Sequence, residues 1–118
     1  MDNQILSVQN KGIPNKEFLL IEVINDNNLG EYIVHDNSYK DGMVVSNKLR
    51  HLFEFPQKLV RKGELIALFT GKRNSLGQGN PSGMLVHHFY WELDQPIWND
   101  DNDIAVLVKV AERRSRSV

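Results

Sequence analysis

The sequence predicts an all-β fold in which two antiparallel sheets pack face to face. Three observations lead to this prediction. Short runs rich in β-branched and aromatic residues recur along the chain, each run is followed by a cluster of Asn, Asp, Gly, Ser or Pro, and no segment has the long periodicity of an amphipathic helix. About seven to nine short strands fit this pattern, and a small barrel is the competing architecture.

Successive runs give the expected strands. They cover residues 17–24, 31–35, 43–45, 50–55, 58–60, 64–70, 84–91 and 104–110. The polar string over residues 25–28 and the Lys62-Gly63 pair are turn signals, and Pro56 prevents the run before it from continuing as an interior strand. In the last run, one face carries Ile104, Val106, Val108 and Val110, and Lys109 lies on the other, which indicates a sheet with one face toward solvent.

Length and composition fit a single domain over residues 1–118, with 41% hydrophobic and 25% charged residues. We expect the core over residues 17–110 and a flexible basic tail over residues 111–118. The formal net charge of −1 predicts no overall attraction to nucleic acid or to an acidic membrane. The chain has no cysteine, which excludes disulfides, thiolate metal sites and cysteine nucleophiles.

The first apolar run, Phe18 to Ile24, is short and is interrupted by Glu22. It follows a polar start that carries Asp2 where a signal peptide would carry Lys or Arg. The run is also far shorter than the roughly 20 apolar residues that a membrane-spanning helix needs. We therefore expect no signal peptide, no membrane contact and a cytoplasmic location.

The most specific pattern lies near the end of the chain. Phe89-Tyr90-Trp91-Glu92-Leu93 is followed by Ile97-Trp98-Asn99, and then by Asp103 and the apolar residues 104–107. This order resembles the closing motif of lamin tail domains, in which a Trp-Asn pair precedes a tight turn, an Asp and an apolar last strand. Asn102 stands where the family commonly has Gly, a substitution that the left-handed tendency of Asn tolerates.

Earlier segments resemble the same family in the same order. Glu31-Tyr32-Ile33-Val34 is similar to its early strand, and Phe53 to Gly63 is similar to its central unit of strand, Phe-Pro pair, turn and strand. The family's Leu-Ser-Gly-Trp stretch is replaced by Asp41-Gly42-Met43-Val44. The resemblance extends from Glu17 to Val110. It implies an immunoglobulin-like sandwich that carries binding rather than catalysis, with DNA or protein partners.

Trp98, Asn99 and Asp103 form the first candidate site. A structural interpretation packs Trp98 into the core, while Asn99 and Asp103 hydrogen-bond backbone amides of the turn. The functional alternative makes Trp98 a platform for a ligand. The sequence favours the structural interpretation, because Asx side chains commonly play this part in turns.

Metal and catalytic sites have weak signals. Asp94, Asp100, Asp101 and Asp103 offer oxygen ligands, but the fixed glycine and distal Glu of a calcium loop are missing. His87 and His88 are adjacent on a predicted strand, so they point to opposite faces, and neither His35 nor His51 has zinc-ligand spacing to them. No carboxylate pair or nucleophile motif stands out. We therefore predict no metal site, no cofactor and no catalytic residue.

The loop from Gly71 to Gly83 is the preferred binding candidate, because long loops on a small scaffold often carry function. It begins with Lys72 and Arg73 after Gly71, and the turn before the preceding strand carries Arg61 and Lys62. If these strand ends converge, the four cations form a local basic patch that can contact phosphates. The basic tail adds Arg113, Arg114 and Arg116.

Together these features predict a non-catalytic interaction module with a protein partner, and nucleic acid is the alternative ligand. A second hypothesis is a structural protein that forms homo-oligomers, because Phe18 to Ile24 is apolar on both faces. A third is the accessory domain of a metal-dependent hydrolase, with the metal at Asp100, Asp101 or Asp103.

Overall fold

A computed structural model describes residues 1–40, 43–44, 51–73, 85–98 and 103–117. The described chain is built from strands and one short 3-10 helix. In order they are β1 (Asn3–Gln9), β2 (Phe18–Val23), β3 (Asn27–Asn28), η1 (Leu29–Glu31), β4 (Tyr32–Lys40), β5 (Met43–Val44), β6 (Leu52–Glu54), β7 (Leu59–Val60), β8 (Leu65–Phe69), β9 (Val86–Tyr90) and β10 (Asp103–Lys109). The all-β prediction is confirmed.

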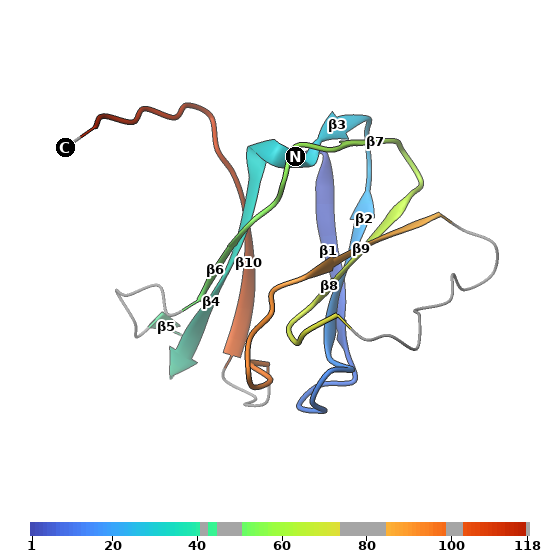
Figure 1. Cartoon of the computed structure of the whole chain (residues 1–118), viewed down its shortest axis with the longest axis vertical. Helices are drawn as coiled ribbons and strands as arrows, with labels where there is room; N and C mark the ends of the chain where they lie inside the picture. Colours follow the sequence, from blue (N-terminus) through green and yellow to red (C-terminus); the bar gives the residue numbers. More distant parts are fainter. Residues whose placement is uncertain (41–42, 45–50, 74–84, 99–102, 118) are drawn as a thin grey trace.

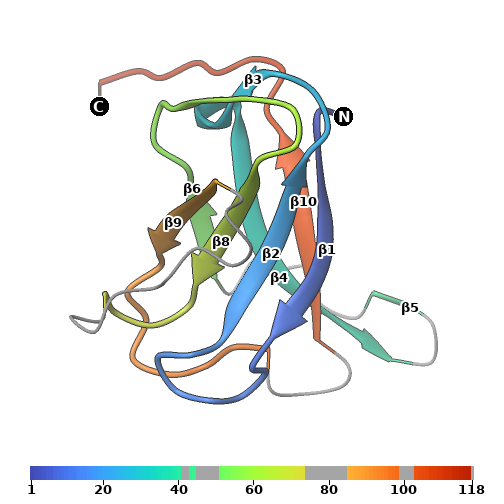
Figure 2. The ribbon, with the colours of Figure 1, turned by 90° about the vertical axis from the view of Figure 1, so that its right-hand side faces the viewer.

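Two larger sheets face each other (Figures 1 and 2). One has the strand order β1-β2-β8-β9, and the other has the order β10-β4-β5, with β6 also paired to β4. A small third sheet joins β3 and β7. Over the described residues the sheets stay separate, so the arrangement is a sandwich of layers and the barrel alternative is not supported. No helix in the described chain is long and apolar enough to cross a membrane.

The core lies between the two larger sheets and follows strand alternation. Its fully buried side chains include Leu19, Ile21, Val23, Tyr32, Val34, Ile66 and Leu68. Aromatic rings join the layers, because Phe55 of the β6 region meets Phe89 of β9 edge to face, with centroids 5.1 Å apart. Each such ring removes a large apolar area from water, and burial of this kind is the main stabilising contribution in a sandwich.

The first strand, β1, lies outside the core boundary that the sequence predicts at residue 17. It pairs antiparallel with β2, and its Ile5 and Val8 pack against the core. Its other residues are mostly polar, which is why its sequence does not look like a strand. A register shift between Ile5 and Ser7 marks a β-bulge. The expected boundary at residue 17 is therefore wrong.

Two further predictions need correction. Residues 25–28 contain a short strand, because Asn27 and Asn28 pair with Val60 and Leu59. The β8 and β9 strands run parallel, with Leu65 beside Val86 and Phe69 beside Tyr90, so the expectation of wholly antiparallel sheets is wrong for this pair. Parallel neighbours need a crossover of a dozen or more residues, and residues 70–85 provide that length.

The last strand, β10, shows the predicted alternation, but the face that carries Ile104, Val106 and Val108 is the outer one. The reason is its partner β4, whose buried Tyr32 and Val34 face the core. Register pairs Leu107 with Val34, so Leu107 and its same-face neighbour Ala105 turn inward. The opposite face of β10, with Ile104, Val106 and Val108, therefore turns outward. The sequence of β10 alone does not reveal this direction.

Glu17 ties three connections together just before β2. It is fully buried, and its carboxylate accepts hydrogen bonds from the Gly12 amide at 2.7 Å, the Thr70 hydroxyl at 3.0 Å, and the amides of Ile97 and Trp98 at 3.0 and 3.3 Å. This carboxylate thus fixes the chain before β10 against the ends of β2 and β8.

Candidate functional site

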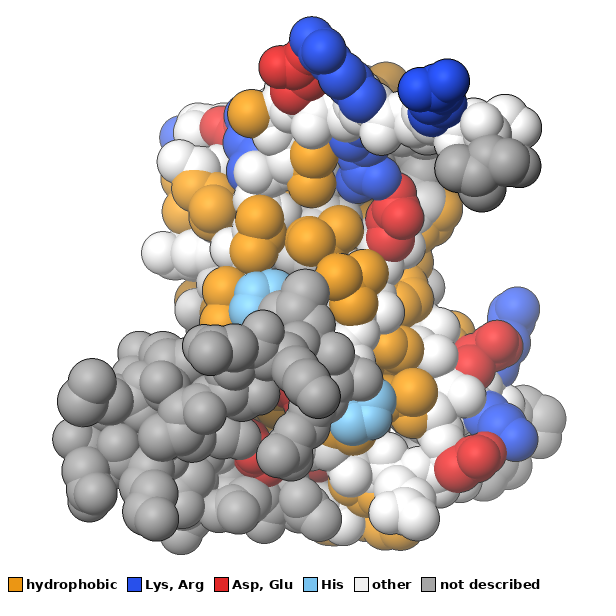
Figure 3. All heavy atoms as spheres, turned by 90° about the vertical axis from the view of Figure 1, so that its left-hand side faces the viewer, with side chains coloured by type: hydrophobic (Ala, Val, Ile, Leu, Met, Phe, Trp, Pro, Cys, Tyr) orange, Lys and Arg blue, Asp and Glu red, His pale blue; other side chains and the backbone are white. Residues whose placement is uncertain are grey.

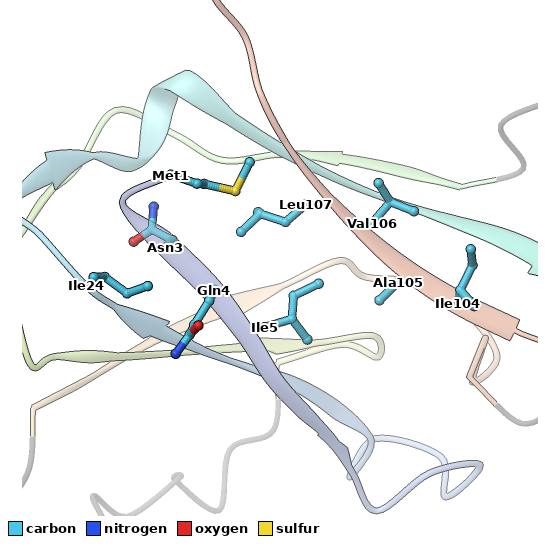
Figure 4. A pocket seen from close by; sticks show the side chains of 9 residues that line it. All are labelled: Met1, Asn3, Gln4, Ile5, Ile24, Ile104, Ala105, Val106 and Leu107. Carbon is cyan, nitrogen blue, oxygen red and sulfur yellow. The ribbon is translucent and has the colours of Figure 1, made fainter.

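Two of the edge strands, β1 and β10, flank an open groove of about 640 Å³ (Figure 4). Among the described residues, β1 pairs only with β2 and β10 pairs only with β4, so each presents one edge without a strand neighbour. The β1 side lines the groove with Met1, Asn3, Gln4 and Ile5, and the β10 side lines it with residues 104–107. Backbone groups at such an edge are available to a further strand.

The floor of this groove is apolar. Ala105 and Leu107 point from β10 toward β1, and Ile5 points back toward them (Figure 4). The polar side chains already have partners, because Asn3 and Asn27 exchange two amide hydrogen bonds of 3.0 Å and Gln4 donates to Glu22 at 2.9 Å. The groove therefore offers apolar side chains and strand-edge backbone groups.

The outer face of the second sheet continues this apolar surface around β10. Register places Val108 beside Ile33, and places Val106 and Leu52 on either side of His35. Leu52 is 45% exposed. Figure 3 views this side and shows hydrophobic side chains gathered on it, with Lys, Arg, Asp and Glu mainly at the margins. We call the groove and this face together the β10 surface; its members are Ile5, Ile33, Leu52 and residues 104–108.

Charged groups mark the two ends of β10. Lys109 closes the strand, and its ammonium lies 3.5 Å from the Asp2 carboxylate and 3.9 Å from that of Glu31. Asp103 opens the strand. Between them the strand is wholly apolar, so β10 has an acidic start, an apolar middle and a basic end.

The structure does not bring the four predicted cations together. Arg61 and Lys62 precede β8, where their backbone amides donate to Glu64 and Asp26, whereas Lys72 and Arg73 follow β8 at its other end. A five-residue strand spans about 17 Å. Lys72 lies 3.4 Å from Asp94 in an exposed ion pair. Most of the loop from Gly71 to Gly83 lies outside the described residues.

Trp98 is only 2% exposed, and its ring is tilted against Trp91 with centroids 6.2 Å apart. This burial is what the structural interpretation of Trp98 requires, whereas a ligand platform needs an exposed ring face. Asp103 is the first residue of β10. Asn99 lies outside the described residues, as do Asp100 and Asp101 of the calcium hypothesis.

Two histidines pair with carboxylates. His51 Nδ1 lies 3.0 Å from Asp36, which also accepts the His51 backbone amide at 2.9 Å. His87 Nε2 lies 3.0 Å from Glu64, and this hydrogen bond, with one from the Arg61 amide, lowers the pKa of Glu64. His88 packs edge-on against Phe69, and burial lowers its pKa. Both pairs link neighbouring segments, and the described part of the chain contains no cluster of three or more His, Asp or Glu suited to a metal.

Sequence reasoning missed the β10 surface because it assigned two-sided apolar character to Phe18 to Ile24. In the structure, Phe18 of that strand is already covered by Phe69 of the neighbouring strand β8. The two ring centroids lie 4.8 Å apart, and Phe69 is almost fully buried. The available signal was Asp103 to Lys109, where apolar residues occupy both faces between two opposite charges. Such a run suits a strand that is covered on more than one side.

Comparison of the chain with protein-family models, curated proteins and solved structures found no significant match.

Proposed function

We propose that this chain is a non-catalytic protein-binding module, a lamin tail-like domain with an immunoglobulin-like sandwich, and that the β10 surface is where it binds its partner. One observation carries the proposal: a strand edge without a neighbour in the described chain separates an apolar groove from an apolar outer face. A partner that adds a strand there gains backbone hydrogen bonds from the edge and apolar burial on both sides.

The chemistry of this surface favours protein over nucleic acid. A nucleic-acid site needs several cations that neutralise phosphates. The β10 strand carries one basic side chain, Lys109, which is too few for such a site. Extended polypeptide, in contrast, presents alternate apolar side chains together with its own backbone donors and acceptors.

The test is a selection of peptides from a displayed random library on the immobilised protein, followed by affinity measurement with each selected peptide. We expect peptides with apolar residues at alternate positions. Val106→Lys places an ammonium group at the centre of the surface and should weaken their binding about tenfold or more, since apolar contacts would be replaced by a charge that must be desolvated.

Leu59→Lys is the matched control. It makes a similar change at a residue that is 79% exposed on β7, away from β10, and should leave peptide affinity unchanged. The double variant Lys72→Ala, Arg73→Ala should also leave it unchanged. A rise in melting temperature with nucleic acid that this double variant abolishes would instead assign the function to the loop and to phosphate binding.

A further inference from the structure

We infer that the partner of the β10 surface is a second copy of the same chain, and that two copies pair their β10 strands antiparallel, edge to edge, about a twofold axis at Val106. The inference rests on the proposed function, because it names the occupant of the same surface. It joins the two β10-β4 sheets into one sheet that runs through the dimer, a closed and isologous arrangement.

Charge complementarity on β10 supports this occupant. When two antiparallel copies are centred on Val106, Asp103 of each copy stands directly opposite Lys109 of the other. The two residues share one face of the strand, since they are six positions apart and side chains alternate. Directly opposed unlike charges are a favourable cross-strand pair, and the twofold axis generates two of them.

The apolar residues match in the same register. Val106 meets its own copy, and Ile104 lies opposite Val108 on the outer face that Figure 3 displays. On the groove side, Ala105 lies opposite Leu107. The smallest apolar side chain of the strand thus faces one of its larger ones, and no like charges oppose each other. A shift by two residues would lose both opposite-charge pairs.

The two edge strands that flank the groove differ in how they are protected against further pairing. The β1 edge carries a bulge between Ile5 and Ser7, a common device that prevents a strand from pairing further. The β10 strand keeps continuous register with β4 over all seven residues and contains no proline. A regular apolar edge of this length is a template for another strand, so of the two strands beside the groove β10 is the one suited to further pairing.

Sedimentation velocity over a wide range of protein concentration provides the test. The wild-type chain should pass from monomer to dimer, and Val106→Lys should weaken dimerisation about tenfold or more, because it brings two ammonium groups together at the axis. Leu59→Lys should dimerise like the wild type. Circular dichroism and melting of each variant confirm that the monomer remains folded.

Charge reversal tests the register itself. Asp103→Lys and Lys109→Glu should each weaken the homodimer about tenfold, since each turns both attractive pairs into repulsive ones. The double variant Asp103→Lys, Lys109→Glu should restore the homodimer. Mixing the two single variants should yield a heterodimer. In one of its pairs the lysine introduced at position 103 faces the glutamate introduced at position 109, and in the other the native Asp103 faces the native Lys109. A purely intramolecular role of either residue cannot produce this rescue by mixing.

The outcomes separate the two proposals. A wild-type chain that stays monomeric at every concentration, while selected peptides still bind and Val106→Lys weakens them, overturns the dimer and keeps the protein-binding function. A dimer that Val106→Lys leaves intact, or single variants that mixing does not rescue, overturns this register of β10. Absence of both dimer and peptide binding removes the proposed function as well. A dimer with rescue by mixing supports both.

Discussion

At the scale of single residues, Glu17 shows how one buried carboxyl group links segments that are distant in the sequence. A fully buried carboxylate is costly unless hydrogen bonds satisfy it, and Glu17 accepts four of them from three separate connections. Two of these donors, the Ile97 and Trp98 amides, are about 80 residues away in sequence. The side chain therefore acts as a long-range link at the base of the sandwich.

Glu17→Ala should lower the free energy of unfolding by about 3 kcal/mol or more, since four donors lose their acceptor in a buried site. Glu22→Ala is the matched control: the side chain of Glu22 makes an exposed hydrogen bond to Gln4, and its loss should cost less than about 1 kcal/mol. Urea unfolding followed by tryptophan fluorescence measures both values. Equal, small losses in the two variants would contradict the linking role of Glu17.

At the scale of elements, the two terminal segments differ in packing: β1 contacts the core, and the C-terminal tail is exposed. The β1 strand covers one edge of β2 and supplies Ile5 and Val8 to the core, and the Asp2 amide donates to the Tyr32 hydroxyl across the layers. Residues 111–117 are exposed, and Arg113 contacts Glu54 on the surface. The two terminal segments are similar in length, but β1 packs against the core and the tail does not.

Removal of residues 1–9 should therefore prevent cooperative folding or lower the free energy of unfolding by several kcal/mol, since it exposes Leu19 and Ile21 and leaves the β2 edge without a neighbour. Removal of residues 111–118 should change that free energy by less than about 1 kcal/mol. Thermal and urea unfolding of both truncated chains measures the contrast. A folded, fully stable chain without β1 would be evidence against its place in the core.

Sequence patterns predicted most strands because β-branched and aromatic runs bounded by turn residues are local signals, as at Phe18–Val23 and Leu65–Phe69. They missed β1 because its sequence is largely polar, as at Asn3, Gln4 and Gln9. These residues belong to a strand through pairing with β2, which the local sequence does not indicate. The sequence also did not indicate that Val106 points outward. That direction follows from the register between β10 and β4, in which Tyr32 and Val34 of β4 face the core. The candidate site depends on that direction, so it emerged only from the three-dimensional arrangement.

At the scale of the whole molecule, positive charge is dispersed. The net charge is −1, the Arg61-Lys62 and Lys72-Arg73 pairs occupy opposite ends of β8, and Arg113 and Arg114 each contact a glutamate. Exposed charges about 17 Å apart act almost independently, because the screening length at physiological salt is about 8 Å. The molecule consequently presents small separate groups of cations instead of one continuous basic surface.

This dispersion predicts how the chain behaves with DNA. Any binding should be weak at physiological salt, and the slope of log K against log salt should be about −2 or shallower, because each pair of cations neutralises at most two phosphates. Fluorescence anisotropy with labelled duplex at several salt concentrations measures the slope. Two double variants test the separate pairs: one combines Arg61→Ala with Lys62→Ala, and the other combines Lys72→Ala with Arg73→Ala. Neither should change the slope by more than about two units. Removal of residues 111–118 controls for the basic tail. A slope near −6 would require the cations to converge in a way that their placement around β8 does not allow. It would favour nucleic acid over protein as the partner.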